Sequence, residues 1–329
     1  MIESLSSPST DPLVIWLNGG PGCSSLIGAF QENGPFIIDD GQNVIKPNTA
    51  AWNVRANLLY LESPAHVGFS IGGANDFNFT DLSAAEDLFA AVQSFFGKFP
   101  EYLLNPLWIT GESYAGVYGP WLAYNLHTWN QAAEIYNQTT YNFKGFAIGN
   151  GITDWTVDAE PSTYETFYEM DLIPKSLYDQ FAANDCKFNV GNPYNTSEAC
   201  KALQTTVSSL IAGLDIYDLY RTTYGVNSSV PNTGAAISAY LGRADVRASL
   251  HIPLQVQAWE RCTSNPLFHY PFSREATLWI YTILKPYGYQ LMHYSGDTDG
   301  KVPTLGTRRW VAELGWPVTQ EWQPWSTDG

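Results

Sequence analysis

The chain has 329 residues, which is long enough to bury a large hydrophobic core in one elaborated domain or two. Its 45% apolar and 15% aromatic content excludes a disordered or fibrous chain, and no apolar run is long enough to span a bilayer. Sixteen Lys and Arg against 32 Asp and Glu give a net charge of −16, so the surface repels nucleic acid and anionic membranes and suits an acidic compartment.

The first half of the chain predicts strands that alternate with helices. Strands are predicted at 13–17, 57–62, 107–110 and 143–148, with a glycine-rich loop at 18–22 and a helix at 83–96. The strand at 107–110 leads directly into a further helical pattern. This alternation favours a parallel sheet with right-handed crossovers.

The pattern changes at about Gly151. The stretch 151–271 is helix-rich, predicts no parallel strand, and is interpreted as an insertion, or cap, that covers the sheet edge. The sheet resumes at 290–294, and a helix over 304–314 leads to a last strand near Val318. The predicted division is therefore a core of 1–150 and 272–329 interrupted by a helical insertion at 151–271.

The junction of strand and helix after residue 110 carries the first candidate for chemistry. Ser113 lies on a sharp turn with Gly111 two residues before it and Ala115 two residues after it. Small residues at these places are typical of the nucleophile elbow of α/β hydrolases, although the general motif has glycine where Ala115 stands. An ordinary turn serine is the alternative interpretation.

An acyl-transfer site also needs an acid and an oxyanion hole. Asp299 follows a late strand, stands three residues after a glycine and precedes a Val-Pro step, so we predict it as the acid and expect Asp297 to cap the turn. The alternative is that both are merely turn aspartates. The oxyanion hole is predicted from the N–H groups of Tyr114, which follows the nucleophile, and of Gly20 in the glycine-rich loop.

Cysteines and glycosylation sequons indicate an oxidising compartment. The four cysteines lack zinc-ligand spacing and allow three disulfide pairings; they are Cys23, Cys186, Cys200 and Cys262. Four sequons, at Asn78, Asn137, Asn195 and Asn227, favour a secretory route. No signal peptide precedes the first strand, so we expect the N-terminus to be truncated.

Seven segments, in order over nearly the whole chain, resemble the serine carboxypeptidases. They are Trp16–Ser25, Gln31–Pro35, Asn57–Pro64, Val67–Ser70, Gly111–Gly116, Gly149–Gly151 and Ser295–Gly300. The resemblance implies an α/β-hydrolase fold, with a mostly parallel sheet flanked by helices and a helical cap. It implies a serine-type carboxypeptidase that releases C-terminal residues through an acyl-enzyme. The implied partner is a peptide or protein with a free C-terminus, and no metal or organic cofactor is implied.

The resemblance also implies how the substrate is held. The free carboxylate of the peptide would be bound by Asn18 and Glu112, assisted by the Gly19 N–H, with Trp16 and Glu32 completing the network. Two bare carboxylates a hydrogen bond apart repel, so a carboxyl side chain can bind a carboxylate only while they share a proton. We therefore expect peptidase activity at acid pH. Likeness to the family further implies the disulfides Cys23–Cys262 and Cys186–Cys200.

The catalytic histidine of the family follows the acid, and the sequence ends at Gly329 before that segment is expected. We expect a chain cut at both ends and inactive, or nearly so, on its own; true loss of the base is the alternative. His66 lies in a loop where relatives often carry glycine and is a weak candidate for the base. The other histidines are placed wrongly for that role; they are His127, His251, His269 and His293.

Two other functions remain open at this point. An acyltransferase or lyase could use the same scaffold, and a non-catalytic binding or protective homologue could have lost the base. The expected location is vacuolar, lysosomal or secreted. The residue preference at the cleaved position, processing into two chains, and a homodimer or another oligomeric state are left open.

Overall fold

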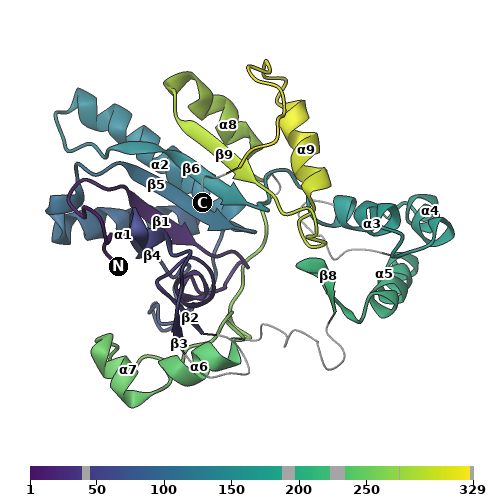
Figure 1. The fold of residues 1–329 in the computed structure, drawn as a ribbon, viewed down its shortest axis with the longest axis horizontal. Helices are drawn as coiled ribbons and strands as arrows, with labels where there is room; N and C mark the ends of the chain where they lie inside the picture. The colour runs from purple at the N-terminus through teal and green to yellow at the C-terminus, as the bar shows by residue number, and fades with distance from the viewer. Residues whose placement is uncertain (39–44, 187–196, 223–233, 274, 327–329) are drawn as a thin grey trace.

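A five-stranded parallel sheet forms the centre of the computed structural model, which describes residues 1–38, 45–186, 197–222, 234–273 and 275–326 (Figure 1). The strand order is β4-β1-β5-β6-β9, and every pair is parallel. The strands are β1 (Leu13–Leu17), β4 (Asn57–Tyr60), β5 (Leu107–Glu112), β6 (Phe143–Gly149) and β9 (Gln290–Tyr294).

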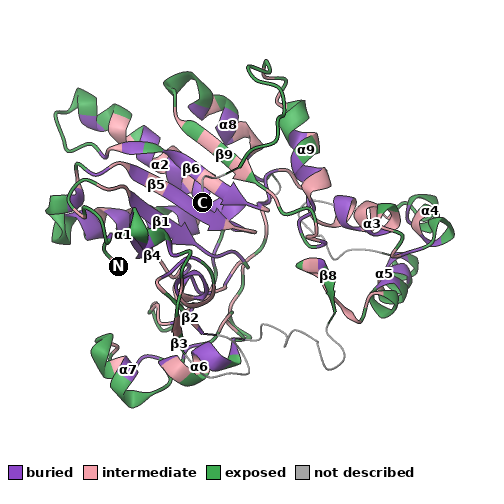
Figure 2. Ribbon diagram, viewed as in Figure 1, coloured by how far each residue is buried: buried purple, intermediate pink, exposed green. Residues whose placement is uncertain are grey.

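Helices cover the sheet, which explains why its inner strands are largely apolar, whereas the edge strand β9 has no fully buried residue. The flanking helices are α1 (Asp81–Lys98), α2 (Ala115–Ile135), α8 (Leu278–Leu284) and α9 (Thr304–Glu313). All five residues of β1 are buried, and alternate side chains enter different clusters: Leu13 and Ile15 join the main core, and Val14 packs with Leu58. Figure 2 shows this arrangement, with mostly buried inner strands β1, β5 and β6, an edge strand β9 that is exposed or half-buried, and exposed outward faces on α1 and α2.

Most predicted elements are confirmed, with ends that shift by a few residues. The predicted strand at 57–62 ends at Tyr60, and the predicted helix at 83–96 extends over Asp81–Lys98 because Thr80 caps it, accepting from Ser83 N at 3.1 Å. The predicted strand near Val318 is wrong: described residues 315–326 form no strand or helix. Pro317 removes a backbone donor there, and Val318 is 71% exposed, so no face of this segment is buried.

The chain between β6 and α8 is helix-rich, as predicted. Its elements are α3 (Glu160–Glu169), α4 (Lys175–Ala183), α5 (Glu198–Leu210), the antiparallel pair β7 (Leu214–Asp215) and β8 (Asp218–Thr222), α6 (Ala235–Leu241) and α7 (Ala244–Ser249). Helices α3 to α5 and β8 share a core of their own that includes Phe167 and Phe181. In Figure 1 they lie beyond the carboxyl ends of the central strands.

Helix α6 and the residues that follow it pack elsewhere. Ile237 and Leu241 form a cluster with Ile27 and Ile38, close to the antiparallel pair β2 (Phe36–Ile38) and β3 (Ile45–Pro47). Figure 1 shows α6 and α7 beside that pair, away from α3 to α5. The stretch between β6 and α8 therefore consists of two differently packed pieces.

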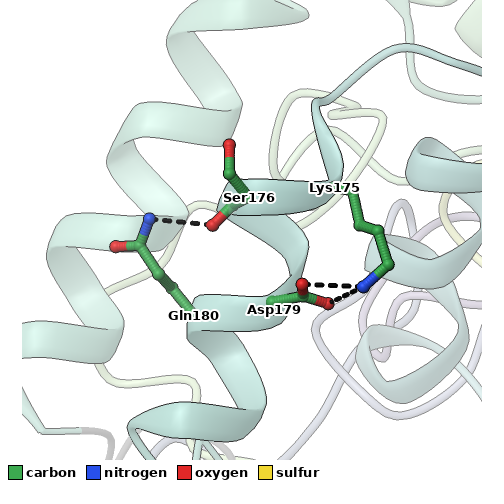
Figure 3. A network of polar contacts seen from close by, with 4 residues as sticks. All are labelled: Lys175, Ser176, Asp179 and Gln180. Atoms are coloured by element: carbon green, nitrogen blue, oxygen red, sulfur yellow. Dashed lines mark hydrogen bonds and ion pairs between the residues drawn. The ribbon is translucent and has the colours of Figure 1, made fainter.

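Helix α4 shows why this stretch has a helical pattern. Leu177 and Phe181 enter the core on one face. The polar contacts are local: Lys175 Nζ lies 2.7 Å from both carboxylate oxygens of Asp179, and Gln180 Nε2 donates to Ser176 O at 3.0 Å (Figure 3). Such i, i+4 contacts stabilise a helix without fixing where it packs.

Two disulfides connect the parts of the chain. Cys23 is bonded to Cys262, 239 residues away, and Cys186 to Cys200, 14 residues away. These are the pairs implied by the resemblance. Of the sequon asparagines, Asn78 and Asn137 are exposed. The sequons at Asn195 and Asn227 lie outside the described residues. Within the described part of the chain, no helix has both the length and the apolarity that a membrane crossing requires.

Candidate active site

Ser113 occupies the turn between β5 and α2 with a positive φ of 61°. Residues other than glycine rarely adopt this backbone conformation, so the surrounding structure has to hold Ser113 in it. Ser113 N donates to Gly149 O at 3.0 Å, and Ser113 O accepts from Gly116 N at 3.0 Å and Ile152 N at 3.1 Å. The serine backbone is thus fixed on both sides.

The small residues around Ser113 have a steric explanation. A Cβ on Gly111 would lie 2.2 Å from Leu17 O, and a Cβ on Gly116 would lie 2.3 Å from Ile152 O. Both positions therefore require glycine, because backbone atoms cannot move aside. Ala115 is fully buried in the main core, where its methyl group fits.

The glycine-rich loop after β1 lies against this turn. Gly20 has a φ of +122°, which favours glycine, and is exposed. Neither the Gly20 N–H nor the Tyr114 N–H has an acceptor among the described residues. Tyr114 also immediately precedes α2, whose N-terminus favours negative charge. The two predicted oxyanion donors are therefore available for a ligand oxygen.

Asp299 lies in the loop that joins β9 to α9. Its Oδ1 accepts from Lys301 N at 2.6 Å and Val302 N at 3.1 Å, and its Oδ2 has no partner among the described residues. Burial raises the pKa of this carboxyl above its usual range. Asp297 is exposed and accepts no hydrogen bond from a described residue. The expectation that Asp297 caps the turn is wrong, since Asp299 accepts those N–H groups instead.

The residues predicted to bind a carboxylate are brought together around Asn18. Its Oδ1 accepts from Trp16 Nε1 at 2.9 Å and from Gly28 N at 3.0 Å, which fixes the orientation of the amide. Its Nδ2 donates to Glu32 Oε1 at 2.9 Å and Glu112 Oε1 at 3.0 Å. Gly19 N also donates to Glu112 Oε1, at 3.2 Å. We call Asn18, Glu32 and Glu112 the carboxyl cluster.

Both glutamates of the carboxyl cluster have raised pKa values. Desolvation, and then the charge of Glu112, raises the pKa of Glu32, although the residue as a whole is exposed. Desolvation also raises the pKa of Glu112, and the charge of Asp299 acts in the same direction. Arg261 opposes both shifts. Asp299 and the carboxyl cluster thus belong to one electrostatic site.

All five histidines lie in the described part of the chain, and their hydrogen bonds and ring contacts there are with groups other than Ser113. His66 stacks on Phe77, and His127 contacts the hydroxyl of Tyr289 at 3.2 Å. The remaining three histidines are engaged as follows: His251 N donates to Ala248 O, His269 pairs with Asn78, and His293 bonds to the Tyr281 hydroxyl. Burial lowers the pKa of His293 to about 3. Among the described residues, no hydrogen bond joins any histidine side chain to Ser113 or Asp299.

Three residues of the site were not predicted from the sequence. Desolvation raises the pKa of Tyr217, between β7 and β8, and the charges of Glu112 and Asp299 act in the same direction. Arg261 adjoins Cys262, whose disulfide brings it to the glycine-rich loop. Asn150 contacts the loop that bears Asp299. Only Asn150 has a sequence signal, an asparagine between two glycines at the end of a strand.

Comparison with known proteins gives consistent results. A family model described as "Serine carboxypeptidase" matches residues 1–329. Serine carboxypeptidase-like 33 of Arabidopsis thaliana is 35% identical over 358 residues, covering 98% of this chain and 73% of that protein. The lysosomal protective protein of Mus musculus is 31% identical over 374 residues, covering 99% of this chain and 76% of that protein.

The fold has a counterpart among solved structures. The yeast protein KEX1(delta)p, a prohormone-processing carboxypeptidase from Saccharomyces cerevisiae, superposes with a TM-score of 0.74 over 93% of this chain and 69% of that chain. The two are 24% identical, so this likeness concerns the fold alone. Together with the parallel sheet and its flanking helices, it confirms the predicted α/β-hydrolase fold.

Proposed function

Since this chain belongs to the serine carboxypeptidase family, a family of hydrolases that cleave peptides, we propose that its site removes the last residue of a peptide at acid pH. The observation that carries this proposal is the carboxyl cluster beside Ser113. Asn18 Nδ2 and Gly19 N both donate to Glu112 Oε1, and Glu112 is the residue directly before Ser113. A substrate carboxylate can share these donors and a glutamate proton.

The proposed reaction begins at Ser113. Its Oγ attacks the carbonyl carbon of the last peptide bond, and the oxyanion that forms accepts hydrogen bonds from Gly20 N and Tyr114 N. The amine of the released residue leaves with a proton, and water then hydrolyses the acyl-enzyme. Asp299 Oδ2 is the oxygen that would orient the imidazole that transfers these protons.

The general base is not among the five histidines of this chain. Loss of a triad member costs about 10⁴- to 10⁶-fold in rate. We therefore expect residues 1–329 assayed alone to hydrolyse peptides and to react with fluorophosphonates slowly, over long incubations, while substrate binding, which needs no base, is unaffected. Binding is for this reason the primary test of the proposed function.

The test compares an N-blocked dipeptide with its C-terminal amide. We expect the free acid to bind at least about tenfold more tightly at pH 5, because only the acid can share a proton with the carboxyl cluster. Ser113→Ala should retain this preference and lose covalent labelling by a fluorophosphonate. Equal affinity for acid and amide would contradict the proposal.

We also propose an oxidising, acidic location, in the vacuole or lysosome or outside the cell. Two disulfides, a net charge of −16 and exposed sequon asparagines at 78 and 137 support it. A relative that carries the name lysosomal protective protein adds to that support. An endoglycosidase should reduce the mass of the protein isolated from its source, and an unchanged mass would count against this location.

A further inference from the structure

Asn150 lies where the backbone that holds the nucleophile meets the loop that holds the acid. It directly follows β6 and has a positive φ of 38°, a conformation that asparagine tolerates better than most residues. Its own N–H donates to Tyr294 O at 3.0 Å, at the end of β9. The residue therefore stands between two neighbouring parallel strands at their carboxyl ends.

The side chain of Asn150 binds both ends of the loop that carries Asp299. At the first end, Oδ1 accepts from Gly296 N at 2.9 Å, and Nδ2 lies 3.2 Å from Gly296 O and 3.2 Å from Ser295 Oγ. At the second end, Nδ2 donates to Val302 O at 3.1 Å. One amide thus closes the loop on either side of Asp299.

The backbone around Asn150 holds Ser113. Gly149 O accepts from Ser113 N, and Ile152 N donates to Ser113 O, at 3.0 and 3.1 Å. Residues 149–152 therefore fix the nucleophile through the main chain, while the side chain within that segment fixes the acid loop. No other described side chain makes hydrogen bonds to both ends of that loop.

We propose that Asn150 is a positioning residue that sets the distance between Ser113 and Asp299. The inference rests on the proposed function, because it assigns to Asn150 the alignment of the nucleophile with its acid. Asn150 does not act on the substrate. It acts through Asp299, whose Oδ2 has to meet an imidazole within hydrogen-bond distance, and a misplacement of about 1 Å can cost about 10²-fold in rate.

A simpler role for Asn150 would be to allow the tight turn after β6. Glycine adopts a positive φ more easily than asparagine, so Asn150→Gly keeps the turn and removes the amide. This variant separates the two roles. A residue needed only for its backbone conformation would tolerate it, whereas a positioning residue would not.

Asn137 provides a matched control. It also has a positive φ, 51°, it is exposed, and its side chain makes no hydrogen bond to a described residue. Asn137→Gly is therefore the same substitution at a comparable backbone conformation. Because Asn137 begins a sequon, all proteins are compared after treatment with an endoglycosidase.

Two measurements test the proposal. Hydrogen exchange at the amides of Lys301 and Val302, which donate to Asp299, should become at least about tenfold faster in Asn150→Gly and stay unchanged in Asn137→Gly. With free imidazole added to supply the missing base, the kcat for a blocked dipeptide, per folded protein, should fall at least about tenfold while KM stays within about twofold. Asn150→Gly that matches Asn137→Gly in both measurements would overturn the inference.

The outcomes distinguish this inference from the proposed function. If the proposed function is wrong, the unmodified protein fails to prefer a free C-terminus, whatever residue stands at 150. If only the inference is wrong, the preference for a free C-terminus is intact. The amide exchange rates and the kcat of Asn150→Gly then equal those of Asn137→Gly.

Discussion

Gly19 lies directly against the backbone nitrogen of Tyr114: a Cβ on residue 19 would stand 2.4 Å from that nitrogen. It would also stand 2.8 Å from the Cβ of Ser113. The glycine-rich loop and the nucleophile turn, about 95 residues apart in the sequence, are therefore packed backbone against backbone. The two proposed oxyanion donors, Gly20 N and Tyr114 N, belong to the two segments that this contact joins.

The first prediction concerns this contact. Gly19→Ala should lower the free energy of unfolding by about 1–3 kcal/mol and strongly slow labelling of Ser113 by a fluorophosphonate, because the added methyl group pushes the two loops apart. Urea denaturation and labelling rates measure the two effects. Gly97→Ala is the control, since a Cβ there meets nothing within 4 Å. Normal labelling of Gly19→Ala would refute this account of the oxyanion hole.

The second prediction concerns pH. The raised pKa values of Glu32 and Glu112 mean that the pair retains a proton at mildly acid pH and loses it as the pH rises. Affinity for a peptide with a free C-terminus should therefore fall by about tenfold for each pH unit above the raised pKa. Glu112→Gln, which cannot ionise, should weaken this fall to a few-fold between pH 5 and pH 8.

The control for the pH experiment is a second glutamate with a raised pKa. Burial raises the pKa of Glu62, but its carboxylate bonds to Ser24, the Phe69 N–H and Trp259, outside the carboxyl cluster. Glu62→Gln should keep the pH profile of the unmodified protein. A profile that is the same for Glu112→Gln and the unmodified protein would remove the role assigned to Glu112.

The third prediction concerns the long disulfide. Cys23 follows the glycine-rich loop, so replacing Cys23 and Cys262 by serine should reduce stability by about 2–5 kcal/mol and slow the labelling of Ser113. Replacing Cys186 and Cys200, whose bridge closes a short loop, should reduce stability but leave labelling unchanged. Thermal unfolding and labelling rates measure both pairs. If only the replacement of Cys186 and Cys200 slowed the labelling of Ser113, the long disulfide would not be the one that supports the nucleophile turn.

The fourth prediction concerns Asp158, which has no exposed surface. Its Oδ2 accepts from Thr153 N at 2.7 Å and Asp154 N at 3.0 Å, and its Oδ1 has no partner among the described residues. Burial raises the pKa of this carboxyl to about 7, from about 3.9 in an unfolded chain. Its contribution to stability is therefore complete below pH of about 4 and is lost as the pH rises towards 7.

The free energy of unfolding should accordingly decrease by at least about 1 kcal/mol from pH 4 to pH 7 through this group alone. Asp158→Asn, which cannot ionise, should remove that part of the slope in urea titrations at several pH values. Asp297→Asn, at an exposed carboxyl without a described partner, serves as the control. If Asp158→Asn keeps the full slope, the buried carboxyl is not its source.

The sequence predicted the elements whose signal is local. The apolar run of β1 and the Gly111-to-Gly116 turn could be read directly, because burial and backbone crowding leave few residue types acceptable there. The carboxyl cluster was reached only through resemblance to a family, since Asn18 and Glu112 are 94 residues apart and no local pattern pairs them.

The errors and omissions have the same physical origin. Asp297 and Asp299 are both turn aspartates beside glycine, and only the fold determines which of them accepts the N–H groups of Lys301 and Val302. The link from Asn150 to Gly296 spans 146 residues and exists because β6 and β9 are neighbours in the sheet. Sequence periodicity does not specify that order.

Two main-chain hydrogen bonds join the pair β7 and β8 to the loop that carries Asp299: Leu219 N donates to Thr298 O, and Gly300 N donates to Ile216 O, each at 2.9 Å. Amide and carbonyl groups are common to nearly every amino acid, so this attachment tolerates wide variation in the side chains around Tyr217. Side chains at the turn between β7 and β8 can therefore vary without breaking the two hydrogen bonds that hold the Asp299 loop.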